Sequence, residues 1–242
     1  MVNAPVGFQC PSCAAISSPR ASRATPTSNS GWLANIPPVT RWILLTCVGI
    51  YFYTRFTGAA DDWNFSYGMW PYGVASGQWY RLLSATFLHA GILHLLFNMY
   101  ALYVLGPNLE RLLGSRQFFG LYFSSALGGS ALGLWFSDSN SNSIGASGAI
   151  FGLLTATIVI GRHLRADVSQ LIVLLAINAV IGFSGGIDWR AHLGGALTGA
   201  LIAAMYVQDQ KGTSRVLQRV GTGGVAIGLL VLIFLRCQQL IA

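Results

Sequence analysis

Residues 89–106 read HAGILHLLFNMYALYVLG, an apolar stretch without Asp, Glu, Lys or Arg. Eighteen helical residues rise by about 27 Å, which is close to the thickness of the hydrocarbon core of a bilayer. The stretch therefore predicts a transmembrane helix over about residues 89–109. Two polar residues inside it, His94 and Asn98, are four positions apart and lie on one helix face.

Further apolar runs on both sides of this stretch predict six more spans. We therefore expect an all-α, polytopic membrane bundle. A six-helix core is predicted over 39–208, and residues 209–242 are predicted to form a charged linker and a seventh transmembrane helix. The six additional spans cover about residues 40–57, 116–136, 146–161, 168–184, 190–207 and 221–241.

The composition agrees with a chain that is embedded in lipid. Hydrophobic residues make up 53% and charged residues 9%, and the mean hydropathy is +0.57, whereas soluble domains carry about 25% charged residues. The 29 glycines favour close packing of membrane helices. The net charge of +7 comes mainly from cations in short segments between apolar runs. This pattern is typical of topology signals and not of a nucleic-acid-binding face.

The positions of these cations predict the orientation of the chain. For seven spans, the cation-rich segments all lie on one side, which is cytoplasmic by the positive-inside rule. We expect a multi-pass protein of the bacterial cell membrane with its N-terminus inside. The aromatic segment 58–88 then lies outside and is expected to pack at the membrane interface. The cations that set the orientation are Arg20, Arg23, Arg41, Arg111, Arg116, Arg162, Arg165, Lys211, Arg215 and Arg219.

Residues 1–38 are rich in Ser, Pro, Ala, Thr and Asn, and predict a disordered cytoplasmic tail. Cys10 and Cys13 have the spacing of half a zinc site, but a closed site needs four ligands and no His or further Cys occurs nearby. We therefore expect no obligatory metal and no cofactor. Cys47 and Cys237 lie in apolar runs and are expected to be inert thiols.

A candidate nucleophile opens the fourth span. Residues 145–152 read GASGAIFG, so Ser147 lies at a junction between a loop and a helix. Backbone N–H groups at such a junction are unpaired and can face a developing oxyanion. Taken alone, a Ser among Gly and Ala is more typical of helix packing.

A candidate base opens the sixth span, where residues 191–199 read AHLGGALTG. Gly195 and Gly199 are four residues apart and allow close approach to the fourth span, which would bring His192 to Ser147. His94 and Asn98 can donate hydrogen bonds either to an oxyanion or between helices, and the residues leave both readings open. On a helix, the preceding His89 would point about 140° away from His94, and we expect it to make a structural hydrogen bond.

The inventory of residues favours serine chemistry. A zinc protease of the His-Glu-x-x-His type needs a Glu between its histidines, but Glu110 is the only Glu and is followed by Arg111. An aspartyl protease needs two intramembrane Asp residues, and here the acids fall in loops or at span ends. Ser147, His192, His94 and Asn98 share one depth. No acid is placed to orient His192, so a Ser–His dyad is expected.

These motifs together resemble the rhomboid family of intramembrane serine proteases over about residues 40–207. The family has a six-helix core, and some members carry a seventh helix. The Cys10/Cys13 half-site also resembles the end of a cysteine-rich zinc module that precedes some bacterial rhomboids. The motifs are Trp79-x-Arg81, His89-x4-His94-x3-Asn98, Glu110-x3-Gly114, Gly145-x-Ser147-Gly148 and Ala191-His192-x2-Gly195-x3-Gly199.

The resemblance implies that Ser147 is the nucleophile and His192 the general base. It implies an oxyanion hole formed by the Ser147 backbone N–H, His94 and Asn98. Phe151 stands where some relatives have a Tyr beneath the catalytic His, so ring stacking is retained and the hydroxyl is lost. Supporting structural roles are implied for Trp79, Arg81, His89, Glu110, Gly145, Phe151, Gly195 and Gly199.

The expected function is therefore cleavage of transmembrane protein substrates near their outer ends. Two alternatives stay open. One is a non-catalytic membrane binding protein of the same fold. The other is a small transporter, because broken helices with polar groups at membrane depth also suit transport, although no repeat that relates the two halves of the chain is evident.

Overall fold

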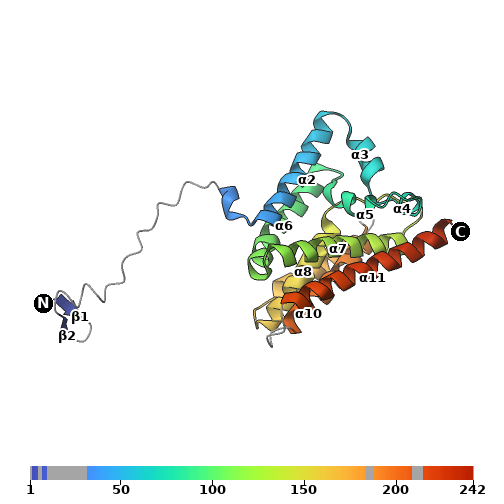
Figure 1. The fold of residues 1–242 in the computed structure, drawn as a ribbon. Helices are drawn as coiled ribbons and strands as arrows, with labels where there is room; N and C mark the ends of the chain where they lie inside the picture. The colour runs from blue at the N-terminus through green and yellow to red at the C-terminus, as the bar shows by residue number, and fades with distance from the viewer. Residues whose placement is uncertain (1, 5–6, 10–31, 184–187, 209–214, 242) are drawn as a thin grey trace. The chain divides into compact units, whose positions relative to one another are not determined.

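The computed structural model describes residues 2–4, 7–9, 32–183, 188–208 and 215–241 (Figure 1). The chain divides into two compact units, Met1–Asn35 and Ile36–Ala242. The second unit contains all of the candidate functional residues except the Cys10/Cys13 half-site.

The first unit contains two short strands that the sequence analysis did not anticipate. β1 (Val2–Ala4) pairs antiparallel with β2 (Gly7–Gln9), and a 3-10 helix, η1 (Trp32–Asn35), follows later. Strands of three residues are too short to show a period in the sequence. The stretch that includes Cys10 and Cys13 lies outside the described residues, so the predicted disorder and zinc half-site stay predictions.

The described part of the second unit is helical, which confirms the predicted all-α bundle. Its seven long helices correspond to the seven predicted spans (Figure 1). The largest difference concerns the seventh span, whose helix begins at Arg215 instead of residue 221. The second span begins and ends about three to four residues later than the predicted 89–109. The long helices are α2 (Pro38–Phe56), α6 (Ile92–Leu113), α7 (Ser115–Phe136), α8 (Ser147–His163), α9 (Ser169–Phe183), α10 (Trp189–Gln208) and α11 (Arg215–Ile241).

Length and apolarity alone single out only some of these helices. Among the described residues, α6 and the 218–241 part of α11 are long and apolar enough to cross a membrane, whereas α8 and residues 169–178 are apolar but shorter. α2 contains Arg41 and Arg55, and α7 and α10 are rich in Gly, Ser and Thr, which lower their mean hydropathy. Several of these small and polar residues are buried between helices rather than exposed.

The aromatic segment 58–88 folds into short helices around a buried arginine. Arg81 is only 3% exposed, and its guanidinium donates to the carbonyl oxygens of Phe65 (2.7 Å) and Gly68 (2.8 Å). Trp79, by contrast, leaves 38% of its surface exposed. Arg81 thus ties the successive turns of the segment together. The helices are α3 (Ala60–Tyr67), α4 (Pro71–Ala75), α5 (Arg81–Ser84) and the 3-10 helix η2 (Ala85–Phe87).

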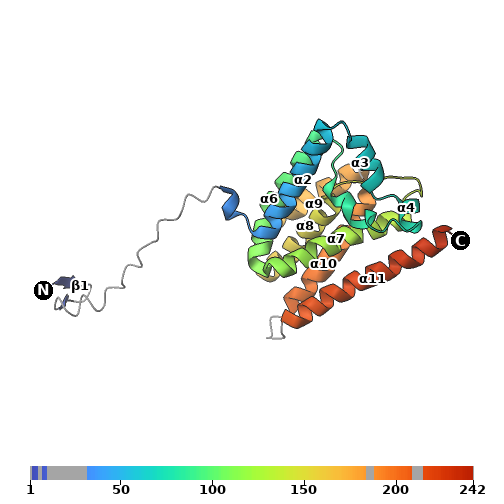
Figure 2. The ribbon, with the colours of Figure 1, turned by 45° about the horizontal axis from the view of Figure 1, so that its top comes forward.

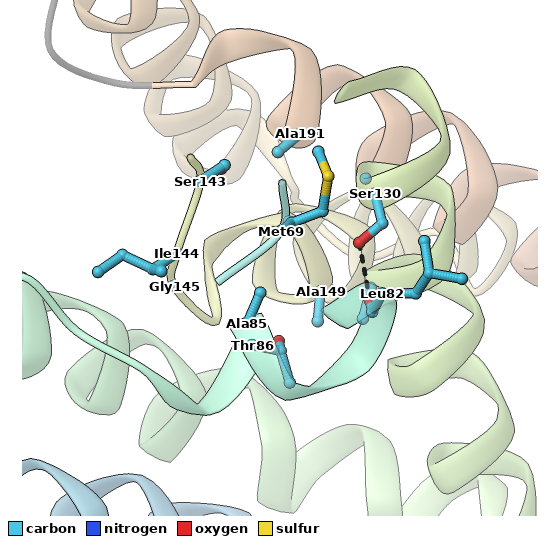
Figure 3. Close-up of a pocket in the computed structure, with 13 residues that line it drawn as sticks. Met69, Leu82, Ala85, Thr86, Ser130, Ser143, Ile144, Gly145, Ala149 and Ala191 are labelled. Carbon is cyan, nitrogen blue, oxygen red and sulfur yellow. Dashed lines mark hydrogen bonds between the residues drawn. The ribbon is translucent and has the colours of Figure 1, made fainter. Parts of the chain in front are cut away.

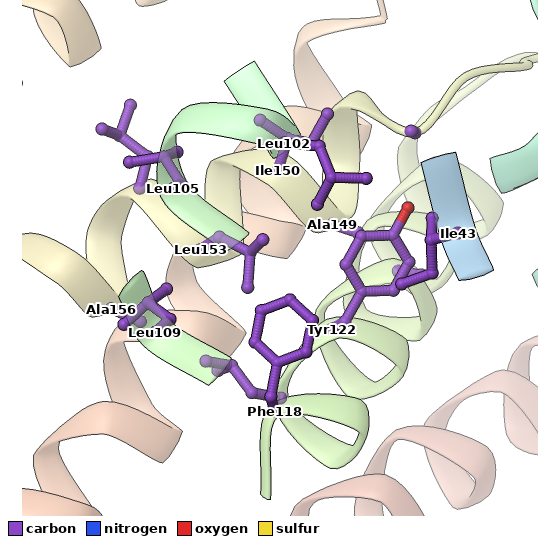
Figure 4. Close-up of a cluster of buried hydrophobic side chains, with 14 of the residues drawn as sticks. Ile43, Leu102, Leu105, Leu109, Phe118, Tyr122, Ala149, Ile150, Leu153 and Ala156 are labelled. Atoms are coloured by element: carbon purple, nitrogen blue, oxygen red, sulfur yellow. The ribbon is translucent and has the colours of Figure 1, made fainter. Parts of the chain in front are cut away.

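The main core lies among α2, α6, α7, α8 and α10, and Figure 4 shows part of it. Phe118 and Tyr122 of α7 are fully buried there against Leu102 of α6, Ile43 of α2 and Leu153 of α8. In a bilayer these side chains exchange lipid contacts for protein contacts, so close van der Waals packing, and not transfer out of water, stabilises the core. The core holds α6 and α8, which carry candidate site residues, in one rigid arrangement.

Glu110 links the starts of two helices to α6. It is 2% exposed, and its carboxylate accepts hydrogen bonds from the backbone N–H groups of Val39 (3.0 Å) and Thr40 (2.8 Å). The hydroxyls of Thr40 and Ser115 each donate to it at 2.7 Å. Since the first N–H groups of a helix lack intrahelical partners, Glu110 caps α2 from another helix.

Glu110→Gln is expected to lower the free energy of unfolding by about 3 kcal/mol, because the amide NH₂ would face donors where a carboxylate oxygen now accepts. SDS-driven unfolding of the purified protein measures this change. Asp62→Asn, on the exposed face of α3, is the matched control and should unfold as the wild type does. Equal stability of the two variants would contradict the capping role.

Close contacts between glycines bring α8 and α10 together. A Cβ added at Gly195 would collide with the backbone of Gly148, and one added at Gly199 would collide with the backbone of Gly152. The Thr155 hydroxyl of α8 also donates to the Ala196 carbonyl of α10 at 2.8 Å. This contact places the first turn of α10 beside the first turn of α8.

The seventh helix, α11, packs along α7 and against α4 (Figure 2). Near its C-terminal end, Arg236 donates to the Leu134 carbonyl (3.3 Å) and lies over the Trp135 ring. Nearer its start, the hydroxyls of Thr222 and Tyr206 are 2.8 Å apart. Polar contacts therefore fix α11 to the six-helix core near both ends.

Candidate active site

Ser147 and His192 meet at one end of the bundle. Ser147 is the first residue of α8, and its Oγ lies 2.8 Å from Nε2 of His192, in the first turn of α10. The imidazole stacks on Phe151, with ring centroids 4.1 Å apart and planes inclined by 12°. Phe151 lies one turn after Ser147 on α8. α8 thus carries both the Ser147 hydroxyl and the Phe151 ring, on which the His192 imidazole stacks.

The loop before Ser147 requires a glycine. Gly145 has φ +133°, a conformation that L side chains rarely adopt. Its N–H donates to the Ala85 carbonyl at 2.9 Å, which fastens the loop to η2. No side chain caps the start of α8 at Ala146, so the N–H groups of the first turn remain available to a ligand.

His94 lies beside Gly145 on the side of Ser147. A Cβ built at Gly145 would be 2.8 Å from both Cε1 and Nε2 of His94, and 3.6 Å from the Ser147 Oγ. A single small group at this point therefore touches both side chains. Asn98 is buried one turn along α6, and its Nδ2 donates to the His94 carbonyl at 2.8 Å. This hydrogen bond of Asn98 thus stays within its own helix.

His89 corrects a helix-based expectation. α6 begins only at Ile92, so His89 precedes the helix and does not point away from His94. Instead the two rings pack edge to face, with centroids 5.1 Å apart. The Phe87 backbone lies nearby, but neither ring nitrogen of His89 meets hydrogen-bond geometry within the described residues. The expected structural hydrogen bond of His89 stays a prediction, and the contact that the structure shows for its ring is the packing against His94.

Asp188 is a residue that the sequence analysis did not assign. Its Oδ1 accepts hydrogen bonds from the backbone N–H groups of Arg190 (3.1 Å) and Ala191 (3.3 Å), so it caps the helix that carries His192. An Asp directly before a helix is a strong capping signal and could have revealed this role. The buried Nδ1 of His192 has no hydrogen-bond partner among the described residues. Asp188 therefore orients the helix turn rather than the imidazole ring.

A small cavity of about 30 Å³ lies next to this pair (Figure 3). Its wall includes Gly145, Gly148 and Ala191, which are neighbours of Ser147 and His192, and the hydroxyl-bearing residues Thr86 and Ser130. This volume has room for about two water molecules. Within the described residues, no cluster of three His, Cys, Asp or Glu side chains could hold a metal ion.

Comparison with known proteins places the chain in a family. The sequence-family model of the rhomboid domain matches residues 76–209 of this chain. The chain is 37% identical to rhomboid protease GluP of Bacillus subtilis over 165 residues, which is 65% of this chain and 32% of GluP. It is 32% identical to the putative rhomboid protease YdcA of the same organism over 193 residues, which is 76% of this chain and 96% of YdcA.

A third relative comes from another bacterium. Rhomboid protease AarA of Providencia stuartii is 30% identical over 203 residues, which is 70% of this chain and 72% of AarA. The chain spans about a third of the length of GluP and most of the length of YdcA and AarA. Together with the family model, which covers more than half of the residues, these similarities show that the chain is an integral membrane protein of the rhomboid family.

Proposed function

We propose that this chain is an intramembrane serine endopeptidase that cleaves transmembrane segments of other membrane proteins near their outer ends. The observation that carries the proposal is the 2.8 Å contact between Ser147 Oγ and His192 Nε2. A Ser and a His at this distance form a nucleophile and its general base. The stacking of the imidazole on Phe151 restrains the base in this position.

The first half of the reaction forms an acyl-enzyme. His192 Nε2 takes the Ser147 proton while Oγ attacks the scissile carbonyl carbon, and the carbonyl oxygen becomes an oxyanion. The oxyanion is stabilised by the Ser147 backbone N–H at the start of α8, with His94 and Asn98 as further donors. His192 then returns its proton to the leaving amine, and the peptide bond breaks.

The second half of the reaction needs water. His192 Nε2 takes a proton from a water molecule as the water oxygen attacks the acyl carbon. It then gives this proton to Ser147 Oγ as the ester C–O bond breaks, which releases the carboxylic acid product. The cavity of about 30 Å³ beside Gly145 and Ala191 is large enough to keep such water close to the ester. Ser130 in its wall donates its hydroxyl to the Leu82 carbonyl at 2.7 Å, so its oxygen can accept a hydrogen bond from this water.

The substrate must present an extended segment. A carbonyl in a transmembrane helix is hydrogen-bonded within that helix, so helix-destabilising residues near the cleavage site should favour cleavage. With the N-terminus and the cation-rich loops in the cytoplasm, the Ser147 end of the bundle faces the outer side of the membrane. We place the protein in the cell membrane of a bacterium, with the bilayer and transmembrane substrates as its partners.

The test is active-site labelling of the purified protein in detergent, combined with cleavage of a reporter that contains a transmembrane segment. We expect a fluorophosphonate probe to form one adduct, mapped by mass spectrometry to the peptide that contains Ser147, and to block reporter cleavage. A folded protein that neither labels nor cleaves would overturn the proposal and favour a binding protein. Solute uptake into liposomes without proteolysis would favour a transporter.

Phe151→Leu is expected to lower kcat by up to about tenfold, because a stacked ring pair contributes about 0.5–1.5 kcal/mol. Phe151→Tyr keeps the stacking and should retain most of the activity. Steady-state reporter kinetics in detergent measure both variants. If Phe151→Leu cleaved as fast as the wild type, the stacking would have no part in positioning His192.

A further inference from the structure

Arg55 is a cation at an unexpected end of the protein. It lies in the last turn of α2, at the end of the bundle that the proposed orientation places outside, where the positive-inside rule disfavours Lys and Arg. Its guanidinium Nη2 donates to the Ala90 carbonyl at 2.5 Å, and its Cζ lies 5.4 Å from the centroid of the Tyr51 ring. Arg55 thus joins the end of α2 to the segment that precedes α6.

Ala90 connects Arg55 to the candidate oxyanion-stabilising histidine. The Ala90 carbonyl accepts a hydrogen bond from Arg55, and the Ala90 N–H donates a hydrogen bond to His94 Nδ1 at 3.4 Å. The next residue, Gly91, stands at the start of α6 and offers no side-chain cap. The cation therefore holds in place a short segment whose own sequence restrains it little.

The contact with Ala90 selects the tautomer of His94. A neutral imidazole has one N–H donor and one acceptor nitrogen, and the partner of one nitrogen decides the state of the other. Because Nδ1 accepts the Ala90 N–H, the proton resides on Nε2. The Nε2 and Cε1 edge faces Gly145, next to Ser147. An N–H donor at this edge can stabilise an oxyanion, whereas the other tautomer would present a lone pair and repel it.

We propose that Arg55 is a positioning residue, which acts through Ala90 to hold His94 as the Nε2–H tautomer directed at the oxyanion. This proposal rests on the proposed function, because only an acyl-transfer reaction forms that oxyanion. Arg55 does not touch the reacting atoms. Its contribution is to keep one donor in the correct tautomer and orientation before the substrate arrives.

The kinetic test compares Arg55→Gln and Arg55→Lys with the wild type and with Arg162→Gln. Arg162 is exposed in the last turn of α8, at the opposite end from Ser147. Arg162→Gln therefore removes one positive charge far from the site and is the matched control, which should cleave as the wild type does. We expect Arg55→Gln to lower kcat about tenfold with little change in KM, a fraction of the 10²–10³-fold effect of losing an oxyanion donor. Arg55→Lys, whose charged ammonium group reaches further than the shorter, neutral Gln amide and can donate to the Ala90 carbonyl, should recover part of the loss.

A double-mutant cycle with His94→Ala separates positioning from a general structural effect. If Arg55 acts through His94, Arg55→Gln should change kcat less than about twofold in the His94→Ala background. A tenfold loss in both backgrounds, or no loss in the wild-type background, would overturn the proposal. The folded fraction of each variant, measured by size-exclusion chromatography, normalises the rates.

The tautomer itself can be observed without activity. The chain has four histidines, so ¹⁵N-histidine NMR, with His94→Ala for assignment, reports which nitrogen of His94 carries the proton. We expect Nε2–H in the wild type and a mixture of tautomers in Arg55→Gln. An Nδ1–H tautomer in the wild type would refute the proposal. A wild type that is Nε2–H but never cleaves would refute the proposed function and, with it, the role of His94 at an oxyanion, whereas the effect of Arg55 on the tautomer would stand.

Discussion

Ser147→Ala and His192→Asn are each expected to lower kcat for reporter cleavage by about 10⁴-fold or more, and the double variant should be no slower than either single variant. The reason is that the hydroxyl and the imidazole act as a unit. Ser147 Oγ lies 2.8 Å from His192 Nε2, so Ser147 depends on His192 for deprotonation. Without the Ser147 hydroxyl, His192 has no proton to accept. Removal of one residue therefore already removes the contribution of the other.

The measurement is single-turnover cleavage by the purified variants in detergent, with the fraction of folded protein determined for each. His163→Asn is the matched control for His192→Asn, because His163 ends α8 at the opposite end from Ser147 and is exposed. It should cleave as the wild type does. Losses that multiply in the double variant would mean that Ser147 and His192 act in separate steps, and the dyad assignment would fail.

Gly195→Ala is expected to destabilise the bundle by more than about 3 kcal/mol and to lower kcat by more than about 100-fold. A Cβ at this position would meet the backbone of Gly148, on the facing turn of α8. Backbone atoms cannot move aside as a flexible side chain can, so α10 must separate from α8. The separation moves His192 away from Ser147, and a displacement of about 1 Å at a reacting pair costs about 100-fold in rate.

SDS-driven unfolding and reporter cleavage measure the two effects on the same preparation. Gly228→Ala is the matched control, because a Cβ at Gly228 of α11 would meet nothing within 4 Å. It should be neutral or slightly stabilising, since Ala favours helices over Gly by about 1 kcal/mol. If Gly195→Ala behaved like Gly228→Ala, the contact between α8 and α10 would not be what positions His192.

The spans could be predicted because apolarity over sixteen to twenty residues is a local property of the chain. The C-terminal end of α6 could not be predicted in this way. The sequence analysis ended that span at about residue 109, before the charged pair Glu110 and Arg111, but the helix continues to Leu113. The buried Glu110 carboxylate is tolerated within α6 because Val39 and Thr40, about 70 residues earlier in the chain, donate hydrogen bonds to it. No local pattern contains that information.

In the candidate site, too, some features could be predicted from local sequence and others could not. The small-residue spacing at Gly195 and Gly199 was enough to pair α8 with α10 and to bring His192 towards Ser147. The positions of His89 and Arg55 could not be derived from periodicity. His89 lies outside the helix, and Arg55 contacts a carbonyl 35 residues later in the chain.

The sequence by itself therefore determined the membrane bundle, its seven long helices and the residue types available for a Ser–His reaction, because these depend on composition and short-range spacing. Only the tertiary structure decided which long-range hydrogen bonds hold the helix ends: the cap of α2 by Glu110, and the contact of Arg55 with Ala90 beside His94. The physical reason is that a buried polar group is stable only with its partners in place. In this protein, several of those partners lie on other helices, far away in the sequence.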